Sequence, residues 1–114
     1  MASGVVNQSA VINASSSGDN TVVSAVPDHR IVVTTYAVVN NVATAQAVTF
    51  KSGSSTSLSG AMQLPQAIGG GLVAASGASD VSLFQTAPGE ALVANLSAAT
   101  AVAGHVSYRL VRGV

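Results

Sequence analysis

The chain has 114 residues, which is enough for one domain and leaves no room for a second. Only 7% of its residues are charged, where about 25% is usual, and the formal net charge is zero. This composition excludes a basic nucleic-acid-binding face and an acidic tail. No stretch approaches the roughly 18 continuous apolar residues that a membrane-spanning helix needs, although 48% of the chain is hydrophobic. Disulfides and thiolate metal sites are excluded because the chain has no cysteine.

The low charge favours a protein that assembles with other proteins. Ser, Thr, Asn and Gln together supply 35 residues and therefore most of the polarity of the surface. Copies of a chain with zero net charge repel one another weakly, which makes association easy. The alternative is that the chain is simply a small soluble domain.

An antiparallel β-sandwich is the fold that the hydrophobic pattern predicts. Val, Thr and Ser alternate with Ala at a period of two, and clusters of Gly, Pro or Asn interrupt the chain about every ten residues. Residues 1–9 are expected to form a short extended N-terminal arm, and residues 10–114 a single all-β domain of about eight strands. The most common closed arrangement of eight such strands is a jelly roll. The strands are expected at 10–14, 21–26, 29–39, 43–50, 56–58, 72–75, 81–84, 91–96 and 102–111.

Turns are expected wherever residues with permissive backbones gather. Ser15 to Asn20 predicts a turn between the first two strands, and Pro27-Asp28 and Pro88-Gly89 predict two more. Asn40-Asn41 suits a tight turn with positive φ. The Gly69–Gly71 run is expected to be a flexible loop, because it lacks the Lys-Ser/Thr and the helix that follow a phosphate-binding loop.

The strand predicted at 29–39 is apolar on both of its faces. Strict alternation places Ile31, Val33, Thr35, Ala37 and Val39 on one face, and Val32, Thr34, Tyr36 and Val38 on the other. In an antiparallel sheet this indicates that both faces are covered, one by the opposing sheet and one by another surface. The candidate residues for a subunit or capsid interface are therefore Val5, Val6, Val32, Thr34, Tyr36, Val38 and Tyr108.

The last two long strands have clearer faces. In 91–96, Leu92, Ala94 and Leu96 are expected to point inward. In the final strand, the predicted inward face is Val102, Gly104, Val106, Tyr108 and Leu110. Phe50 and Phe84 are expected in the core, with the hydroxyl groups of the two tyrosines at a sheet edge or interface.

No catalytic, cofactor-binding or metal-binding constellation is expected. The chain has two His, three Asp and one Glu, which is too few to gather the four ligands of a closed zinc site. It has no Gly-x-Ser-x-Gly nucleophile elbow, and Glu90 is expected to pair with Arg109 or Arg112 across the sheet. His29 and His105 are expected to be structural, although either would make assembly pH-sensitive if three copies met on an axis.

Several short segments, taken in order, point to a family. They are Ser17–Val23, the VTFKSG segment at 48–53, LSGAM at 58–62, PGEAL at 88–92 and GHVSYR at 104–109. Over residues 10–112 this series resembles small virion proteins of tailed phages. The resemblance implies compact jelly-roll sandwiches that assemble as trimers, either as capsid decoration (cement) proteins or as distal domains of head and tail fibres. It implies no cofactor and no catalytic residue.

The resemblance leads to two functional expectations and leaves a third open. The first is a non-enzymatic homotrimer, made in the host cytoplasm, that binds the major capsid protein on the outer surface of the virion. The second is a host-attachment fibre module that binds a surface glycan, which predicts an exposed pocket with Tyr36 or Tyr108 beside Asn or Asp side chains. The third is a bacterial carbohydrate-binding or scaffolding domain.

Overall fold

The computed structural model describes residues 7–76 and 82–112. Within these ranges the chain forms strands and turns and no helix, which confirms the predicted all-β class. Ten strands are present in the described residues where about eight were expected; β6 was not predicted, and β5 and β8 are pairings of only two residues. The strands are β1 (Gln8–Ala14), β2 (Gly18–Val23), β3 (His29–Asn40), β4 (Gln46–Ser52), β5 (Thr56–Ser57), β6 (Met62–Leu64), β7 (Gly70–Ala75), β8 (Phe84–Gln85), β9 (Leu92–Leu96) and β10 (Val102–Arg112).

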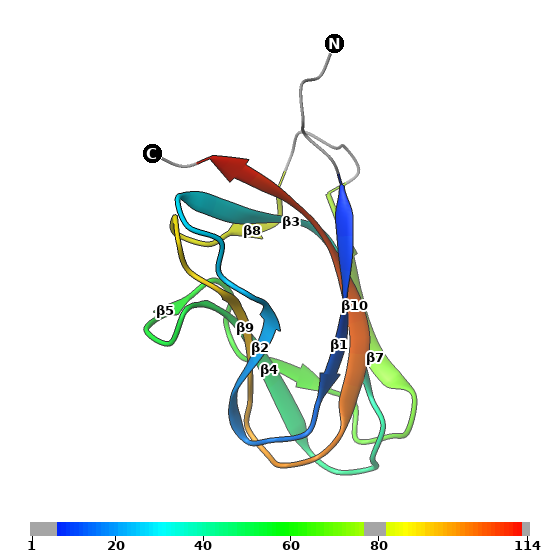
Figure 1. Cartoon of the computed structure of the whole chain (residues 1–114). Coiled ribbons are helices and arrows are strands. Elements are labelled where there is room, and N and C mark those ends of the chain that lie inside the picture. The colour runs from blue at the N-terminus through cyan, green and yellow to red at the C-terminus, as the bar shows by residue number, and fades with distance from the viewer. Residues whose placement is uncertain (1–6, 77–81, 113–114) are drawn as a thin grey trace.

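Two antiparallel sheets face each other and form the predicted sandwich. Sheet A has the order β1-β10-β3-β7, with β8 also pairing β3, and sheet B has the order β2-β9-β4-β5, with β6 also pairing β4. In Figure 1, sheet A carries β1, β10 and β7 on the right, and sheet B carries β2, β9 and β4 on the left. The chain alternates between the sheets from β1 to β4 and again from β8 to β10. Each sheet therefore presents one inward face to the shared core and one outer face.

The inward residues of β9 and β10 follow simple alternation. Leu92, Ala94 and Leu96 lie in the core, as predicted. Val102, Val106 and Tyr108 lie there too, with Leu110 packed against it. The pattern is regular because neither strand carries an extra residue of its own.

The faces of β3 differ from the prediction because the strand contains a β-bulge. Ser107 on β10 pairs with Thr35, and Tyr108 pairs with Val33. Thr34 is therefore an extra residue on β3. An extra residue reverses the alternation on either side of it. The inward side chains are therefore Ile31, Val33, Tyr36 and Val38, which mix the two predicted faces.

Both predicted proline turns are confirmed. The Val26 carbonyl accepts from the amide of His29 at 3.1 Å, and Asp28 between them has a φ of 62°. The turn at 87–90 has the same hydrogen bond between its first and fourth residues: the amide of Glu90 donates to the Ala87 carbonyl at 3.2 Å. The turn predicted at 15–20 is shorter than expected, since β2 already begins at Gly18.

Two other turn predictions are wrong. Asn40 is the fully buried last residue of β3, and among the described non-glycine residues only Asp28 has a positive φ. The side-chain amide of Asn40 donates to the carbonyls of Thr44 at 2.9 Å and Pro65 at 3.0 Å. Gly70 and Gly71 are strand residues of β7, not a flexible loop. A Cβ on Gly71 would lie 2.1 Å from the carbonyl oxygen of Val38, so glycine is needed there for close strand approach.

Candidate functional site

Most of the residues predicted to form an interface lie inside the fold. Val38 is fully buried, and Tyr36 and Tyr108 are each only 9% exposed and belong to the core. The bulge explains the error for Tyr36 and Val38, since it turns both toward the opposing sheet. Val32 and Thr34 are also buried, at 4% and 8% exposed, but lie outside the core cluster. The remaining two candidates, Val5 and Val6, fall outside the described residues.

The two tyrosines use their hydroxyl groups within the chain. Tyr36 donates to the sulfur of Met62 at 3.2 Å, and its ring packs 5.0 Å from that of Phe50. The hydroxyl of Tyr108 donates to Oε1 of Gln8 at 3.2 Å, at the start of edge strand β1. An exposed tyrosine platform for a glycan is therefore not formed by either residue.

The outer face of sheet A carries the two most exposed valines of the described chain. Val11 on β1 and Val73 on β7 are each 77% exposed, and both belong to one row that crosses the sheet. In that row Val11 lies opposite His105, His105 opposite Ala37, and Ala37 opposite Val73. We call this surface the uncharged face; its three rows are Ser9-Ser107-Thr35-Ala75, Val11-His105-Ala37-Val73 and Asn13-Ala103-Val39-Gly71.

Sequence reasoning missed this surface, although a signal for it was present. Within 10–14 the small or apolar residues Ala10, Ile12 and Ala14 alternate with Val11 and Asn13. That alternation already assigns Val11 to the face away from the core. What the local pattern could not provide is the pairing that brings Val11 into line with Val73, which lies 62 positions further along the chain.

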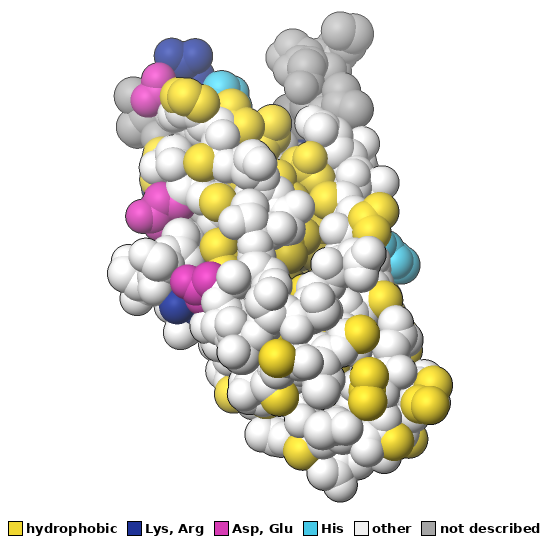
Figure 2. Space-filling model, turned by 60° about the horizontal axis from the view of Figure 1, so that its bottom comes forward, with side chains coloured by type: hydrophobic (Ala, Val, Ile, Leu, Met, Phe, Trp, Pro, Cys, Tyr) yellow, Lys and Arg dark blue, Asp and Glu magenta, His cyan; other side chains and the backbone are white. Residues whose placement is uncertain are grey.

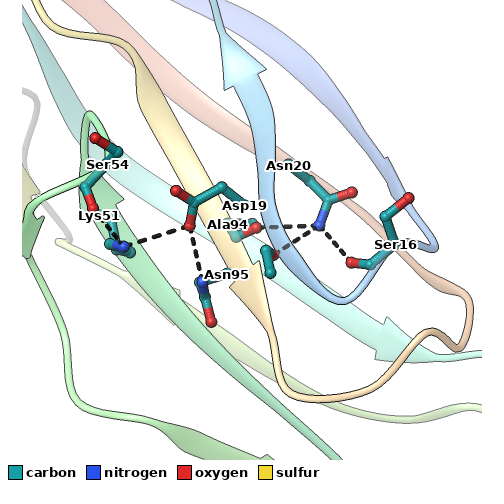
Figure 3. A network of polar contacts seen from close by, with 8 residues as sticks. Ser16, Asp19, Asn20, Lys51, Ser54, Ala94 and Asn95 are labelled. Atoms are coloured by element: carbon teal, nitrogen blue, oxygen red, sulfur yellow. Dashed lines mark hydrogen bonds and ion pairs between the residues drawn. The ribbon is translucent and has the colours of Figure 1, made fainter.

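The outer face of sheet B is polar by contrast. Asp19 on β2 lies opposite Asn95 on β9, and Lys51 on β4 reaches the same carboxylate (Figure 3). The Oδ1 of Asp19 accepts from Asn95 at 2.7 Å and from the Lys51 ammonium at 3.3 Å. Lys51 also donates to the carbonyl of Ser54 at 2.8 Å. These contacts join three strands of sheet B, which is a structural role for the cluster.

The contacts of Asp19 lower the pKa of its carboxyl group. Hydrogen bonding from Asn95, and secondarily the contact with Lys51, holds the pKa of Asp19 below its ordinary value of 3.8, with a partial offset from desolvation. A carboxylate whose pKa is lowered by folding stabilises the fold above its ordinary value and loses that contribution as the pH falls through the folded value. The stabilisation by Asp19 is therefore present at neutral pH and absent in strong acid.

Asp19→Asn is expected to lower the free energy of unfolding at pH 7 and to have a smaller effect near pH 2. The difference at pH 7 should stay below about 1 kcal/mol, because exposed ion pairs contribute little. Urea titrations at the two pH values measure it. Asn95→Ala keeps the carboxylate but removes the largest cause of its lowered pKa. In the Asn95→Ala protein, Asp19→Asn should therefore lower the free energy of unfolding at pH 7 by less. An Asp19→Asn effect that is equal at both pH values would contradict this assignment.

The carboxylate of Glu90 is held by sheet B and not, as predicted, by an arginine. The hydroxyl of buried Ser52 donates to Oε1 of Glu90 at 2.5 Å and accepts from the amide of Ala87 at 2.9 Å. This contact fastens the 87–90 turn to the end of β4. Glu90 thus has a structural partner. The Ser52 hydroxyl contacts Glu90 and Ala87, and neither is the histidine base that activates a serine nucleophile.

Gln46 is a buried polar residue that ties β4 to the loop before β10. Its amide donates to the Ala98 carbonyl at 2.8 Å and to the Thr100 hydroxyl at 2.9 Å. Its Oε1 accepts from the amides of Ala47 and Ala98 at 3.0 and 3.1 Å. Every buried side-chain polar atom among the described residues likewise has a hydrogen-bond partner.

Gln46→Ala is expected to cost about 2–3 kcal/mol of unfolding free energy, because it leaves buried backbone groups without partners. Gln63→Ala is the matched control, since Gln63 lies on the neighbouring strand β6 but is exposed, and its loss should cost less than about 0.5 kcal/mol. Chemical denaturation of the three proteins measures both values. Equal losses in the two variants would show that the Gln46 contacts do not stabilise the loop.

The two histidines lie in different surroundings. His29 at the start of β3 has its Nδ1 2.8 Å from the carbonyl oxygen of Pro27, and His105 is exposed at the middle of the uncharged face. Across residues 7–76 and 82–112, no three His, Asp or Glu side chains come close enough to hold a metal ion. The same part of the chain contains no helix that could span a membrane.

Comparisons with known protein families, with curated proteins and with solved structures found no match. The resemblance to phage virion proteins therefore stays a prediction from the quoted motifs.

Proposed function

We propose that this chain is a non-enzymatic structural protein of a tailed-phage virion. In this proposal it assembles as a homotrimer, sits on the outer surface of the capsid and binds the major capsid protein. The ordered motifs between residues 10 and 112 support the virion assignment. A three-fold decoration protein matches the symmetry of local three-fold positions in a capsid lattice.

The observation that carries the assembly part of the proposal is the contrast between the two outer faces. Sheet B exposes the Asp19–Lys51–Asn95 cluster, whereas the three rows of the uncharged face on sheet A hold only small or uncharged side chains, among them two exposed valines and one histidine. A face without charges can be buried without desolvating them, which favours protein contact. A chain with only 7% charged residues fits the same role.

The strand order supports the jelly-roll form of the sandwich, which we include in the proposal. Sheet A runs β1-β10-β3-β7 and sheet B runs β2-β9-β4-β5, so the first strand of each sheet pairs with a strand from the C-terminal end of the chain. Two interleaved Greek keys produce pairing of this kind.

Glycan binding by a fibre module is the weaker candidate. It predicted an exposed pocket beside Tyr36 or Tyr108, and both side chains are instead buried and engaged within the chain. Aromatic faces are the usual platform for sugars, and the chain has no tryptophan.

The composition of purified particles tests the proposal. Particles released by the phage or prophage that encodes this chain are purified on a density gradient, heads are separated from tails, and each fraction is quantified by mass spectrometry. The proposal expects the chain in the head fraction at a fixed ratio to the major capsid protein. Recovery only with tails would favour the fibre alternative, and absence from particles would refute a virion role.

A further inference from the structure

Met62 carries the one sulfur atom of the described residues. The chain has no cysteine, and its other methionine, Met1, lies outside them. In Figure 2 most of the visible surface is white, which marks backbone and uncharged polar side chains, and the charged side chains occupy small separate areas. A thioether is soft and easily oxidised, which sets Met62 apart from the serines, threonines and alanines that dominate the composition of the chain.

Met62 lies at the rim of the sandwich, where an oxidant dissolved in water reaches it. It begins β6, a strand of three residues that pairs with β4 at the edge of sheet B. Its side chain is half-buried against the core, whereas its neighbours Ala61 and Gln63 are exposed. A pairing this short at the edge of a sheet opens locally at little cost in free energy. Oxidation of the sulfur therefore does not require the whole domain to unfold.

Tyr36 occupies one side of the sulfur. Its hydroxyl donates to Sδ of Met62 at 3.2 Å, a contact that joins β3 of sheet A to β6 of sheet B. The tyrosine ring is held in place by two others, with its centroid 5.0 Å from that of Phe50 and 6.1 Å from that of Phe84. A thioether sulfur has two lone pairs, both of them weak hydrogen-bond acceptors. The tyrosine hydrogen occupies one of them and leaves the other open.

Oxidation by a hydroperoxide uses one lone pair of the sulfur. With hydrogen peroxide, the sulfur attacks one oxygen, and the S–O bond forms as the O–O bond breaks. The second oxygen leaves as hydroxide and takes the proton of the first, which gives the sulfoxide and one water. The sulfur loses two electrons and the peroxide gains them. Because the sulfoxide sulfur is chiral, attack through one lone pair or the other gives opposite epimers.

We propose that Met62 is a site of oxidation by hydroperoxides at which the fold selects one sulfoxide epimer, because the Tyr36 hydroxyl covers one lone pair of the sulfur. Oxygen then adds from the side away from Tyr36. Donation of the hydrogen bond also draws electron density from the sulfur, so Tyr36 slows the reaction as well as directing it. This inference goes beyond the proposed virion role and does not depend on it.

The selection of one epimer has a consequence for repair. Methionine sulfoxide reductases form two classes, and each class reduces one epimer. Oxidation of Met62 in the folded chain should therefore be reversible by one class of reductase and resistant to the other.

Epimer analysis of the oxidised full-length chain tests the proposal. The folded protein is treated with hydrogen peroxide and then digested with trypsin, which cleaves after Lys51 and Arg109 and releases a peptide with Met62 as its sole methionine. The peptide is incubated with a reductase of either class, and mass spectrometry measures the loss of one oxygen atom. One class should restore nearly all of the peptide and the other almost none. A chain oxidised while unfolded in urea should give both epimers in similar amounts.

Tyr36→Phe and Tyr108→Phe form a matched pair of variants. Tyr36→Phe keeps the ring but removes the hydroxyl, so each reductase should restore about half of the peptide, and the oxidation rate should rise about two-fold or more. Tyr108→Phe removes a hydroxyl that contacts Gln8 and not the sulfur, so its epimer ratio and its rate should match those of the wild type. Far-UV circular dichroism checks that both variants are folded.

Four results would overturn the proposal. Equal amounts of the two epimers in the folded wild type would show that the fold does not select between them. A Tyr36→Phe protein that keeps the selectivity of the wild type would assign the selection to the strand and not to the hydroxyl. Loss of selectivity in Tyr108→Phe would show that any weakened packing is enough. A Met62 that stays reduced in the folded chain, under conditions that oxidise the unfolded chain, would show that peroxide does not reach the sulfur.

Discussion

Gly104→Ala is expected to destabilise the domain by about 3 kcal/mol or more, a large share of the 5–15 kcal/mol typical of a folded domain. Gly104 lies in the middle of β10, where β1 and β3 pair on either side. A Cβ there would lie 1.8 Å from the carbonyl oxygen of Ala37 and 3.0 Å from the Cα of Val38. Both are backbone atoms of β3, so relief requires moving a central strand. Urea denaturation followed by circular dichroism measures the loss.

Gly60→Ala is the matched control for this substitution. Nothing lies within 4 Å of a Cβ built on Gly60, so the change should be neutral or slightly stabilising. If Gly104→Ala is too unstable to purify while Gly60→Ala behaves as the wild type, the close approach is supported. Equal stability of the two variants would contradict the packing of β10 against β3.

Phe50→Ala is expected to remove about 3–5 kcal/mol of unfolding free energy, since it leaves a large cavity at the centre of the core. Phe50 on β4 is fully buried, and its ring centroid lies 5.0 Å from that of Tyr36 and 5.2 Å from that of Phe84. These contacts join sheet B to sheet A across the sandwich. Loss of the ring therefore weakens both sheets together.

A graded series keeps this prediction testable if the alanine variant does not fold. Phe50→Leu retains much of the volume and should cost about half as much. Val73→Ala removes two methyl groups from an exposed position and should change stability by less than about 0.5 kcal/mol. A Phe50→Leu protein as stable as Val73→Ala would show that the three rings do not form the centre of the core.

The positions of most strands could be predicted because many of the turns between them contain Gly, Pro or Asp. β6 was missed, and β8 overlaps its predicted range only at Phe84. The pattern at 91–96 and 102–111 correctly identified the inward residues, since neither strand has a bulge that shifts its own faces. The prediction of which side chains of 29–39 face the core was wrong for one reason. The bulge at Thr34 depends on the pairing with β10, and no local pattern reveals that pairing.

The candidate site was harder to predict than the fold. Tyr36 and Val38 were chosen from a two-sided strand and are core residues, whereas the surface that the structure exposes runs through Val11 and Val73. Those two residues come from strands far apart in the chain and meet in one row only through β10 and β3. The predicted partner of Glu90 was wrong for a similar reason. Its partner Ser52 comes from a strand that the sequence does not identify as a neighbour.

The sparse charge of the chain fits a protein that assembles with other proteins. Asp19 and Lys51 form an ion pair on sheet B, whereas none of the positions of the uncharged face on sheet A is charged. In the proposed virion role, a rigid trimer links several weak contacts with the capsid into one tight attachment. Because only 7% of the residues are charged, raised ionic strength should weaken such contacts little.

Rebinding of the purified chain to capsids tests the central claim most directly. DNA-filled heads depleted of the chain are mixed with increasing amounts of it, and the bound copies per head are counted at low and raised ionic strength. The account predicts saturable binding in a multiple of three copies, little dependence on salt, and a higher temperature of DNA release from the decorated heads. Heads that bind none of the chain, or whose temperature of DNA release does not change when it binds, would contradict the account.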